Sequence, residues 1–398
     1  MKYVIRNHAV RICIAASLLA GVVPNANADV ITDWNLKAGE IVTESKLGTP
    51  PAIRAMAIVQ TAVYEAVNAT TPGASINAAV AAANRAALSR LLPSQQASID
   101  SAYQAALTQI PEGAAKTAGI AVGEGAAAAV FAQRANDKVS AAEAYRPHTT
   151  AGAYVPTASP AAPTWAQRAP WLMASPAQFR PGAPPALTTD AWARDYNEVK
   201  ELGSKASTKR SAEQTEIARF WEYSLPPIYH GVVRSVANQS GRDVTRNARL
   251  FAAVTQAMDD AMISVFEAKY QYNFWRPGTA IRNGDIDGND ATQRDASWSP
   301  LIDSPMHPEY PSGHAILAAA VGTVLKADVG DARMPLATTS PTAKGATRRW
   351  TNVDDFVREV ADSRVYAGIH YRTGVDVGAK MGKQIGELTA EKFLQMPH

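Results

Sequence analysis

Apolar side chains recur at helical spacing along most of the chain, and this pattern predicts a largely helical protein. In residues 52–69, Ile53, Met56 and Val59 begin one apolar stripe, because residues three or four apart share a helix face. Alanine-rich segments of high helix propensity follow. No sustained strand alternation is present, so the expected fold class is all-α. The predicted helices are 52–69, 76–92, 97–109, 113–134, 189–203, 211–223, 243–272, 312–326, 352–370 and 375–394.

Two segments interrupt the helical pattern. Segment 152–187 contains eight prolines together with Trp165 and Trp171. Proline fixes φ and removes a backbone donor, so this segment should be irregular, while its aromatic side chains argue against disorder. Residues 278–311 are rich in Gly, Asp, Asn and Pro and indicate a long loop, which is uncommon unless it is functional.

Composition narrows the class of protein. The chain has 398 residues and 46% hydrophobic content, enough for one large domain. Its formal net charge is only +3, so the sequence as a whole indicates neither a nucleic-acid nor a membrane-surface partner. We expect a single helical domain over 29–398, with an N-terminal helical half, 29–240, and a catalytic half, 241–398.

The first 28 residues have the pattern of a signal peptide. Lys2 and Arg6 precede the apolar stretch 12–23, which is too short to span a membrane, and a small-residue cleavage motif ends at Ala28. The only cysteine, Cys13, lies inside this peptide, so we expect no disulfide or thiolate site in the mature protein. The sequence therefore predicts a periplasmic or secreted protein with no membrane span in its mature form.

Polar residues of unusual chemistry gather in the C-terminal part of the chain. Lys269 and Arg276 are seven positions apart, which is two turns if the helix continues, so both are expected to point the same way. Pro277 is expected to end that helix. Taken alone, the two cations also fit a solvated pair at a helix end.

A second group, Ser312, Gly313 and His314, precedes an apolar run and lies at a predicted helix N-terminus. Free amides and the positive end of the helix dipole favour an anion there. Each residue also fits a structural role: Ser312 an N-cap, Gly313 a turn, and His314 a histidine satisfied within the core.

A third group, Ser363, Arg364 and His370, falls in the predicted helix 352–370, where Ser363 and His370 share a face. Apolar neighbours make this helix largely buried, and a buried arginine needs a counter-charge. An external anion suits the guanidinium because two parallel hydrogen bonds can form. Together the three groups predict a pocket for a tetrahedral oxyanion such as phosphate or vanadate.

These groups resemble the signature of the vanadium-dependent haloperoxidase and type 2 phosphatidic acid phosphatase superfamily, and the stretch 274–277 is similar to secreted bacterial haloperoxidases. The resemblance implies the helical-bundle architecture of that superfamily, with vanadate as cofactor or phosphate in the same site. It implies that His370 is the axial ligand of vanadate and that His314 is the catalytic acid–base residue. The residues implied to hold the oxygens are Lys269, Arg276, Ser312, Gly313 and Arg364.

Two further positions bear on this resemblance. Family members commonly have an acidic residue four positions after the last histidine, but here that position is Gly374. Asp376 or a backbone carbonyl is then expected to orient His370, since a ligand histidine usually needs such an acceptor. His307 occupies the position that lines the halide side of the pocket, and a histidine there resembles the bromide-oxidising members. A histidine on a surface loop is the alternative.

The resemblance favours a vanadate-dependent haloperoxidase that uses hydrogen peroxide to oxidise a halide, bromide or iodide rather than chloride, to hypohalous acid. The alternative is a soluble acid phosphatase with a phosphohistidine intermediate, and a third reading is a helical scaffold that binds phosphate without turnover. The long N-terminal half favours the haloperoxidase. The residues leave open whether an organic acceptor exists and what the oligomeric state is. The proline-rich segment is expected to cover the site entrance.

Overall fold

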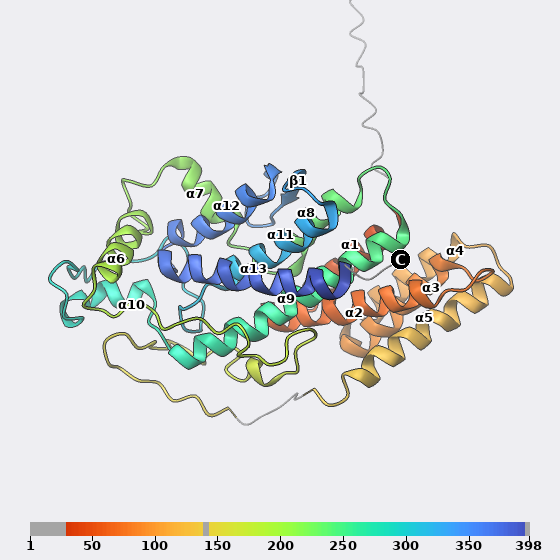
Figure 1. Cartoon of the computed structure of the whole chain (residues 1–398), viewed down its shortest axis with the longest axis horizontal. Coiled ribbons are helices and arrows are strands. Elements are labelled where there is room, and N and C mark those ends of the chain that lie inside the picture. Colours follow the sequence, from red (N-terminus) through yellow and green to blue (C-terminus); the bar gives the residue numbers. More distant parts are fainter. Residues whose placement is uncertain (1–28, 138–142, 395–398) are drawn as a thin grey trace, which may run out of the picture.

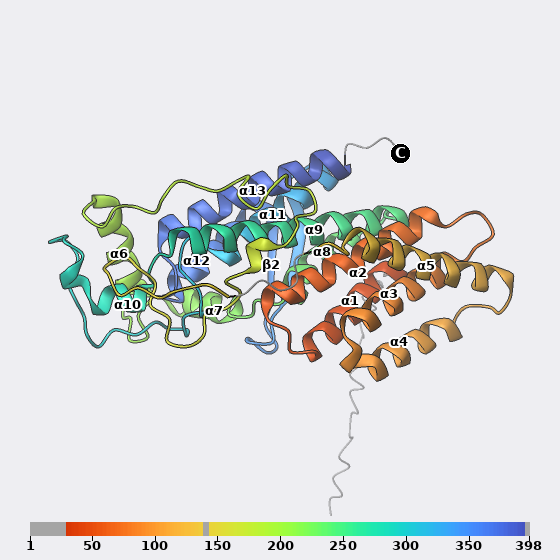
Figure 2. The same cartoon turned by 90° about the horizontal axis from the view of Figure 1, so that it is seen from below.

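The structure, a computed structural model of the 398-residue chain, describes residues 29–137 and 143–394. The predicted signal peptide, 1–28, lies outside the described residues. The described chain is built of α-helices with one small sheet, which confirms the expected all-α class. Figures 1 and 2 show an N-terminal group of helices, α1 to α5, at one end, and the long helix α9 running from it into a C-terminal group.

The N-terminal group comprises α1 (Val30–Glu44), α2 (Thr49–Ala69), α3 (Ile76–Leu91), α4 (Gln96–Thr108) and α5 (Ala114–Gln133). The middle of the chain forms α6 (Asp190–Leu202), α7 (Ala212–Phe220), α8 (Pro226–Ala237), α9 (Val244–Tyr272) and α10 (Pro277–Arg282). The C-terminal part forms α11 (Gly313–Val329), β1 (Arg333–Thr339), β2 (Thr347–Asn352), α12 (Val353–Tyr366) and α13 (Arg372–Leu394).

Helix α9 is the central element of the molecule. Its 29 residues begin after the N-cap Asp243, and Leu250 and Val254 in its first half are fully buried. Helices α2, α11 and α13 all pack against it. A helix that is apolar on most of its surface is stable only when it is buried in this way. Its last turn carries Lys269 into the protein interior, where that side chain is 0% exposed.

A row of glycines on α13 sets its distance from α11. A Cβ at Gly378 would lie 2.7 Å from the backbone oxygen of Ser312, and a Cβ at Gly382 would lie 2.1 Å from that of Ile316. Any side chain at these positions would therefore push the two helices apart. The close packing holds the N-terminus of α11, which begins after Ser312, directly against the start of α13.

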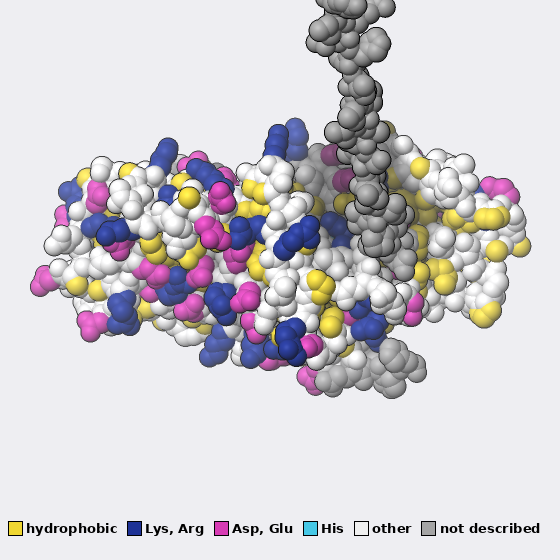
Figure 3. Space-filling model, turned by 90° about the horizontal axis from the view of Figure 1, so that it is seen from above, with side chains coloured by type: hydrophobic (Ala, Val, Ile, Leu, Met, Phe, Trp, Pro, Cys, Tyr) yellow, Lys and Arg dark blue, Asp and Glu magenta, His cyan; other side chains and the backbone are white. Residues whose placement is uncertain are grey.

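Surface charge is distributed unevenly over the molecule. In the view of Figure 3, Lys and Arg side chains alternate with Asp and Glu over the C-terminal group, so neither sign dominates there. The end formed by α3 to α5 carries few charges in this view, in keeping with the alanine-rich sequence of α5. The positive charge that matters for chemistry lies inside the C-terminal group.

The proline-rich segment is irregular, as predicted, and one carboxylate fixes it to α9. Asp260 accepts hydrogen bonds from the backbone N–H groups of Trp171, Leu172 and Met173 at 2.6, 2.8 and 3.1 Å. The indole N–H of Trp171 donates to the neighbouring Asp259 at 2.7 Å. Both aspartates are fully buried, so these bonds satisfy charges that would otherwise be costly.

The sequence missed the hairpin of β1 and β2. These strands pair antiparallel, and β1 alternates buried and exposed positions, but only Met334 and Leu336 carry large apolar side chains inward. That alternation is too short to be recognised by periodicity. The expected long loop at 278–311 is irregular for most of its length, but it begins within α10, which Pro277 opens rather than ends. The sequence also did not predict α1 or α8.

We predict that Asp260→Ala destabilises the protein by roughly 3 kcal/mol, because three backbone N–H groups would lose their acceptor. Burial raises the pKa of Asp260 to about 6, so the carboxylate is ionised at pH 7.5. At that pH the substitution removes its full contribution to the free energy of unfolding. Urea unfolding at that pH measures the effect. Asp290→Ala, at an exposed position, is the matched control and should change stability by less than about 0.5 kcal/mol. Equal effects of the two variants would contradict the anchoring role.

Candidate oxyanion site

One cavity of about 380 Å³ is lined by most of the residues that the sequence predicts for the oxyanion site. It lies where the end of α9, the start of α11 and the connection between α12 and α13 meet. The sequence-predicted residues that line it are Lys269, His307, Gly313, His314, Arg364 and His370. Ser312 lies beneath the surface as the N-cap of α11, where its hydroxyl accepts from the amide of Ala315 at 3.5 Å.

The expected arrangement of Lys269 and Arg276 on one continuous helix is wrong. Helix α9 ends at Tyr272 because Asn273 adopts a left-handed conformation, with φ of 48°. Arg276 then precedes α10 as its N-cap residue. The two cations still meet, because both bind the segment 307–311 that leads into α11.

Lys269 is engaged by backbone oxygens. Its ammonium group donates to the carbonyls of Pro308 and Glu309, at 3.0 and 2.8 Å, and to that of Pro311. An ammonium has three protons, so these contacts use all of them. Burial and the nearby Arg276 lower the pKa of Lys269. The residue lines the cavity, and its hydrogen bonds fix the shape of the segment 307–311.

Arg276 makes the largest set of contacts in the site. It donates through Nε to the carbonyl of His307 at 3.0 Å and through Nη1 to that of Ile369 at 2.7 Å. Its Nη1 also lies 3.2 Å from Nε2 of His370, and its Nη2 lies 2.9 Å from Nδ1 of His307. Arg276 is 3% exposed, and burial lowers its pKa to about 10, so it remains a cation at neutral pH.

His370 does not lie on the same helix as Ser363, contrary to the sequence prediction. Helix α12 ends at Tyr366, and Gly368 then takes φ of 77°, a conformation that side chains rarely adopt. The chain turns there, so His370 lies in the connection to α13. Arg364 stays on α12 as predicted and is 2% exposed.

Glu309 is the partner of His370, and the sequence did not predict it. Its Oε1 lies 2.6 Å from Nδ1 of His370 and also accepts from the amide of Tyr371 at 3.2 Å. Glu309 is 0% exposed. Asp376, the carboxylate proposed from the sequence, is exposed on α13 and is not the orienting group. Glu309 lies 61 residues away from His370, so no local spacing connects them.

The contacts of His370 determine which ring nitrogen carries the proton. Arg276 can only donate a hydrogen bond, so Nε2 of His370 accepts and is unprotonated. The proton of the neutral ring is therefore on Nδ1 and is donated to Glu309. Burial and the positive charges of Arg276 and Lys269 lower the pKa of His370, which keeps the ring neutral. The Nε2 lone pair therefore accepts from Arg276, and a ligand that binds Nε2 would replace this contact.

Gly374 makes room for the carboxylate of Glu309. A Cβ at position 374 would lie 2.4 Å from Oε1 and 2.9 Å from Oε2 of Glu309. The glycine at position 374, where family members commonly have an acidic residue, therefore leaves the space that the Glu309 side chain occupies. A carboxylate still faces the histidine, but it comes from the loop before α11 rather than from α13.

The remaining polar atoms fit a bound oxyanion. Within residues 29–137 and 143–394, Nε of Arg364 and Nε2 of His314 are buried without a hydrogen-bond partner. Nη1 of Arg364 donates to the carbonyl of Trp221. Burial lowers the pKa values of Arg276 and Arg364 to about 10, so both guanidinium groups stay charged at neutral pH, while burial raises the pKa of Glu309 to about 7. The first amides of α11 also lack intrahelical partners. An anion would offset the charge imbalance and complete these hydrogen bonds.

We predict that Glu309→Ala lowers the affinity for vanadate about 10- to 100-fold, because His370 loses the acceptor that fixes its tautomer. Phosphate, which depends on the cations rather than on a bond to Nε2, should bind without comparable loss. Competition calorimetry measures both affinities. Asp376→Ala is the matched control and should change neither. A loss of vanadate binding in Asp376→Ala, but not in Glu309→Ala, would contradict the assignment.

We predict that Gly374→Ala has a similar effect, because the new methyl group displaces the Glu309 carboxylate. The double variant Glu309→Ala with Gly374→Ala should bind vanadate no more weakly than Glu309→Ala alone, since both changes remove the same contact. Gly125→Ala, where a Cβ would meet no atom within 4 Å, is the control. Additive losses in the double variant would show that Gly374 acts independently of Glu309.

Comparisons with known proteins agree with this geometry. Residues 249–398 match the family model described as the second helical-bundle domain of VCPO. The vanadium chloroperoxidase of Curvularia inaequalis is 33% identical over 141 residues, which cover 29% of this chain. That match spans 22% of the chloroperoxidase, about a fifth of its length.

Solved structures resemble the whole chain rather than its C-terminal part alone. The crystal structure of the first bacterial vanadium-dependent iodoperoxidase superposes with a TM-score of 0.78 and 24% identity, and the match covers 91% of this chain and 95% of that one. An apo-type bacterial vanadium-dependent chloroperoxidase superposes with a TM-score of 0.72 and 19% identity, and the match covers 88% of this chain and 95% of that one. Both helical groups of the chain therefore have the fold of these bacterial vanadium haloperoxidases, and the sequence of residues 249–398 matches the second helical-bundle domain of VCPO.

Proposed function

We propose that this protein is a vanadate-dependent haloperoxidase, an enzyme that uses hydrogen peroxide to oxidise bromide or iodide to hypohalous acid. The observation that carries the proposal is the Nε2 lone pair of His370, held toward buried cations while Glu309 accepts the proton on Nδ1. The likeness of the whole fold to bacterial vanadium haloperoxidases supports the proposal over the phosphatase alternative, because it includes the N-terminal group of helices.

The residues of the cavity have distinct roles in this proposal. His370 would hold vanadate through Nε2, and Arg364 and the amide of Gly313 would donate to its oxygens. Arg276 would contribute positive charge, and its N–H group that now contacts Nε2 of His370 would donate to an oxygen of the anion instead. Lys269 contributes positive charge and fixes the segment 307–311 through its carbonyl contacts. Vanadate, when bound, supplies the Lewis acidity that activates hydrogen peroxide toward the halide. Preorganised donors in a buried pocket are effective because they need no rearrangement during the reaction.

His314 is the acid–base residue in this proposal. Burial and the charge of Arg364 lower its pKa, so the ring is neutral at neutral pH. Its Nε2 has no partner in the part of the chain that the structure describes, and the residue lines the cavity. Nε2 can therefore accept a proton from incoming hydrogen peroxide and return it to the leaving oxygen.

The contacts of His307 support a halide-binding site on one side of the cavity. Its Nδ1 lies 2.9 Å from Nη2 of Arg276, and its ring packs edge-on against Phe266 with centroids 5.2 Å apart. A guanidinium next to an apolar ring provides a site for a large, weakly hydrated anion. Bromide and iodide fit this description better than chloride, and one of the fold neighbours is an iodoperoxidase.

The decisive test is an assay of purified, metal-free protein. Oxidation of iodide and bromide by hydrogen peroxide should appear only after vanadate is added, and phosphate should suppress it by competing for the same donors. Hydrolysis of phosphomonoesters that vanadate inhibits, without any halide oxidation, would instead support the phosphatase alternative. Neither activity, despite tight phosphate binding, would support a phosphate-binding scaffold.

We predict that two histidine variants separate ligation from proton transfer. His370→Ala should abolish both vanadate binding and halide oxidation. His314→Ala should retain vanadate binding but lower kcat by about 10²- to 10⁴-fold, the usual contribution of general acid–base catalysis. Equilibrium dialysis measures bound vanadium and steady-state kinetics measures turnover. A fully active His370→Ala variant would refute the site assignment.

We further propose that the protein is exported, with residues 1–28 acting as a signal peptide. Among the described residues, no helix is both long and apolar enough to cross a membrane. N-terminal sequencing of protein recovered from the periplasm or the medium should begin close to Asp29. Recovery of the protein only from the cytoplasm, with its first residues intact, would contradict this proposal.

A further inference from the structure

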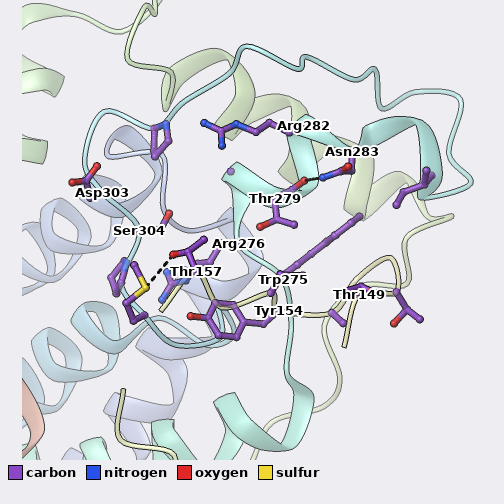
Figure 4. A pocket seen from close by; sticks show the side chains of 18 residues that line it. Thr149, Tyr154, Thr157, Trp275, Arg276, Thr279, Arg282, Asn283, Asp303 and Ser304 are labelled. Atoms are coloured by element: carbon purple, nitrogen blue, oxygen red, sulfur yellow. Dashed lines mark hydrogen bonds between the residues drawn. The ribbon is translucent and has the colours of Figure 1, made fainter. Parts of the chain in front are cut away.

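A cavity of about 710 Å³ lies between the proline-rich segment and α13. Residues 178–183, Tyr310 and one face of α13 line it, and among the described residues it has no lining residue in common with the oxyanion cavity. The cavity drawn in Figure 4 is different, because Asp303, Pro305 and Met306 line both it and the oxyanion cavity. The cavity at α13 is therefore a separate site, and its volume is within the range of about 300–1,000 Å³ that is typical of small-molecule sites.

One face of α13 supplies both apolar and polar groups to this cavity. The lining residues of this helix are connected by steps of three or four positions, which places them on the same side: Thr373, Val377, Lys380, Met381 and Gln384. Met381 is buried and Val377 is partly buried, so the helix offers apolar surface there. Lys380 adds an ammonium group and Gln384 an amide. The face therefore fits a ligand that has an apolar body and a polar end.

Hydrogen bonds from two tyrosines fix the proline-rich side of the cavity. The hydroxyl of Tyr310 donates to the carbonyl of Gly182 at 2.8 Å, and that of Tyr272 donates to the carbonyl of Pro181. The two rings pack edge-on, with centroids 5.5 Å apart. Phe179, on the same segment, is partly buried and lines the cavity. This wall is in place before a ligand arrives, so binding requires little ordering of the chain.

The charge of this cavity is positive and comes from one side chain. Among the described residues its lining contains two cations, Arg180 and Lys380, and no acidic side chain. Arg180 donates through Nε to Glu267 at 2.9 Å, so its charge is offset. The ion pairs of α13 involve Arg372 and Lys383, and so Lys380 has no carboxylate partner in the part of the chain that the structure describes. An ammonium beside apolar surface attracts a ligand with one negative charge.

We propose that this cavity binds a small organic carboxylate with an aromatic or branched aliphatic body. The carboxylate pairs with Lys380 and accepts from the side-chain amide of Gln384. Its body packs against Phe179, Val377 and Met381 and supplies most of the affinity, because burying apolar surface is worth more than an exposed ion pair. Phosphate and vanadate have no such body, so they do not compete for this cavity. The inference is independent of the proposed haloperoxidase activity.

Three probes of the same shape test the charge of the ligand: 4-phenylbutyrate, the neutral 4-phenylbutanamide and the cationic 4-phenylbutylamine. Calorimetry at low ionic strength measures their binding while phosphate saturates the oxyanion site. We predict that one molecule of 4-phenylbutyrate binds per chain, the amide about 3-fold more weakly and the amine about 10-fold more weakly, since an exposed ion pair gives a modest gain and a like charge a similar loss. An amine that binds as tightly as the carboxylate would contradict the role of Lys380.

Reversing the charge at position 380 should reverse the order of the probes. Lys380→Glu is expected to bind 4-phenylbutylamine more tightly than 4-phenylbutyrate, because the apolar surface is unchanged and only the charge differs. Lys383→Glu is the matched control: it makes the same change in net charge on the same helix, but Lys383 does not line the cavity. This control should keep the preference for the carboxylate. The same reversal in both variants would show a general effect of charge and would overturn the inference.

A second variant fills the cavity instead of changing its charge. A Cβ at Gly182 would meet no atom within 4 Å, and the carbonyl that accepts from Tyr310 belongs to the backbone and is retained. Gly182→Trp should therefore weaken all three probes about 10-fold, whereas Gly125→Trp, on α5, should bind them like the unmodified protein. Unchanged phosphate affinity reports that each variant is folded. No saturable binding of 4-phenylbutyrate to the unmodified protein, or unchanged binding in both Gly182→Trp and Lys380→Glu, would overturn the inference.

Discussion

The site depends on one buried contact, the hydrogen bond of 2.6 Å between Glu309 and Nδ1 of His370. Because Arg276 can only donate to the other ring nitrogen, the two neighbours together fix a neutral imidazole with its proton on Nδ1. The opposite tautomer would point a proton at the cavity and remove the lone pair. Every role proposed for the cavity assumes that this lone pair faces the cations.

The fold holds this contact through the segment 307–311. Lys269 in the last turn of α9 and Arg276, the N-cap residue of α10, bind its carbonyls and thereby fix the backbone position of Glu309. Close packing between α11 and α13 brings the start of α13 to the same place, and Gly374 leaves space for the carboxylate. Burying these cations lowers their pKa values and costs stability, and a bound anion offsets that cost.

The sequence predicted most helices and six of the residues that line the cavity, since apolar periodicity and motif spacing are local properties. It placed Arg276 and His370 on the wrong elements, because single residues with positive φ, Asn273 and Gly368, end the helices early. It missed Glu309 because the pairing with His370 is made only by the tertiary fold. Two features of the sequence could have indicated the pairing. The acidic residue expected at position 374 is replaced by glycine, and an acidic residue, Glu309, lies two positions before Pro311, next to the predicted site.

The most direct test of this account is the protonation state of His370, measured by nitrogen-15 NMR of histidine-labelled protein. His370→Gln would identify its resonances among those of the seven histidines. The account predicts a neutral ring at pH 7.5 with Nδ1 protonated and Nε2 unprotonated, and a selective shift of Nε2 when vanadate is added. A ring protonated on Nε2, or a charged imidazolium in the vanadate-free protein, would contradict it.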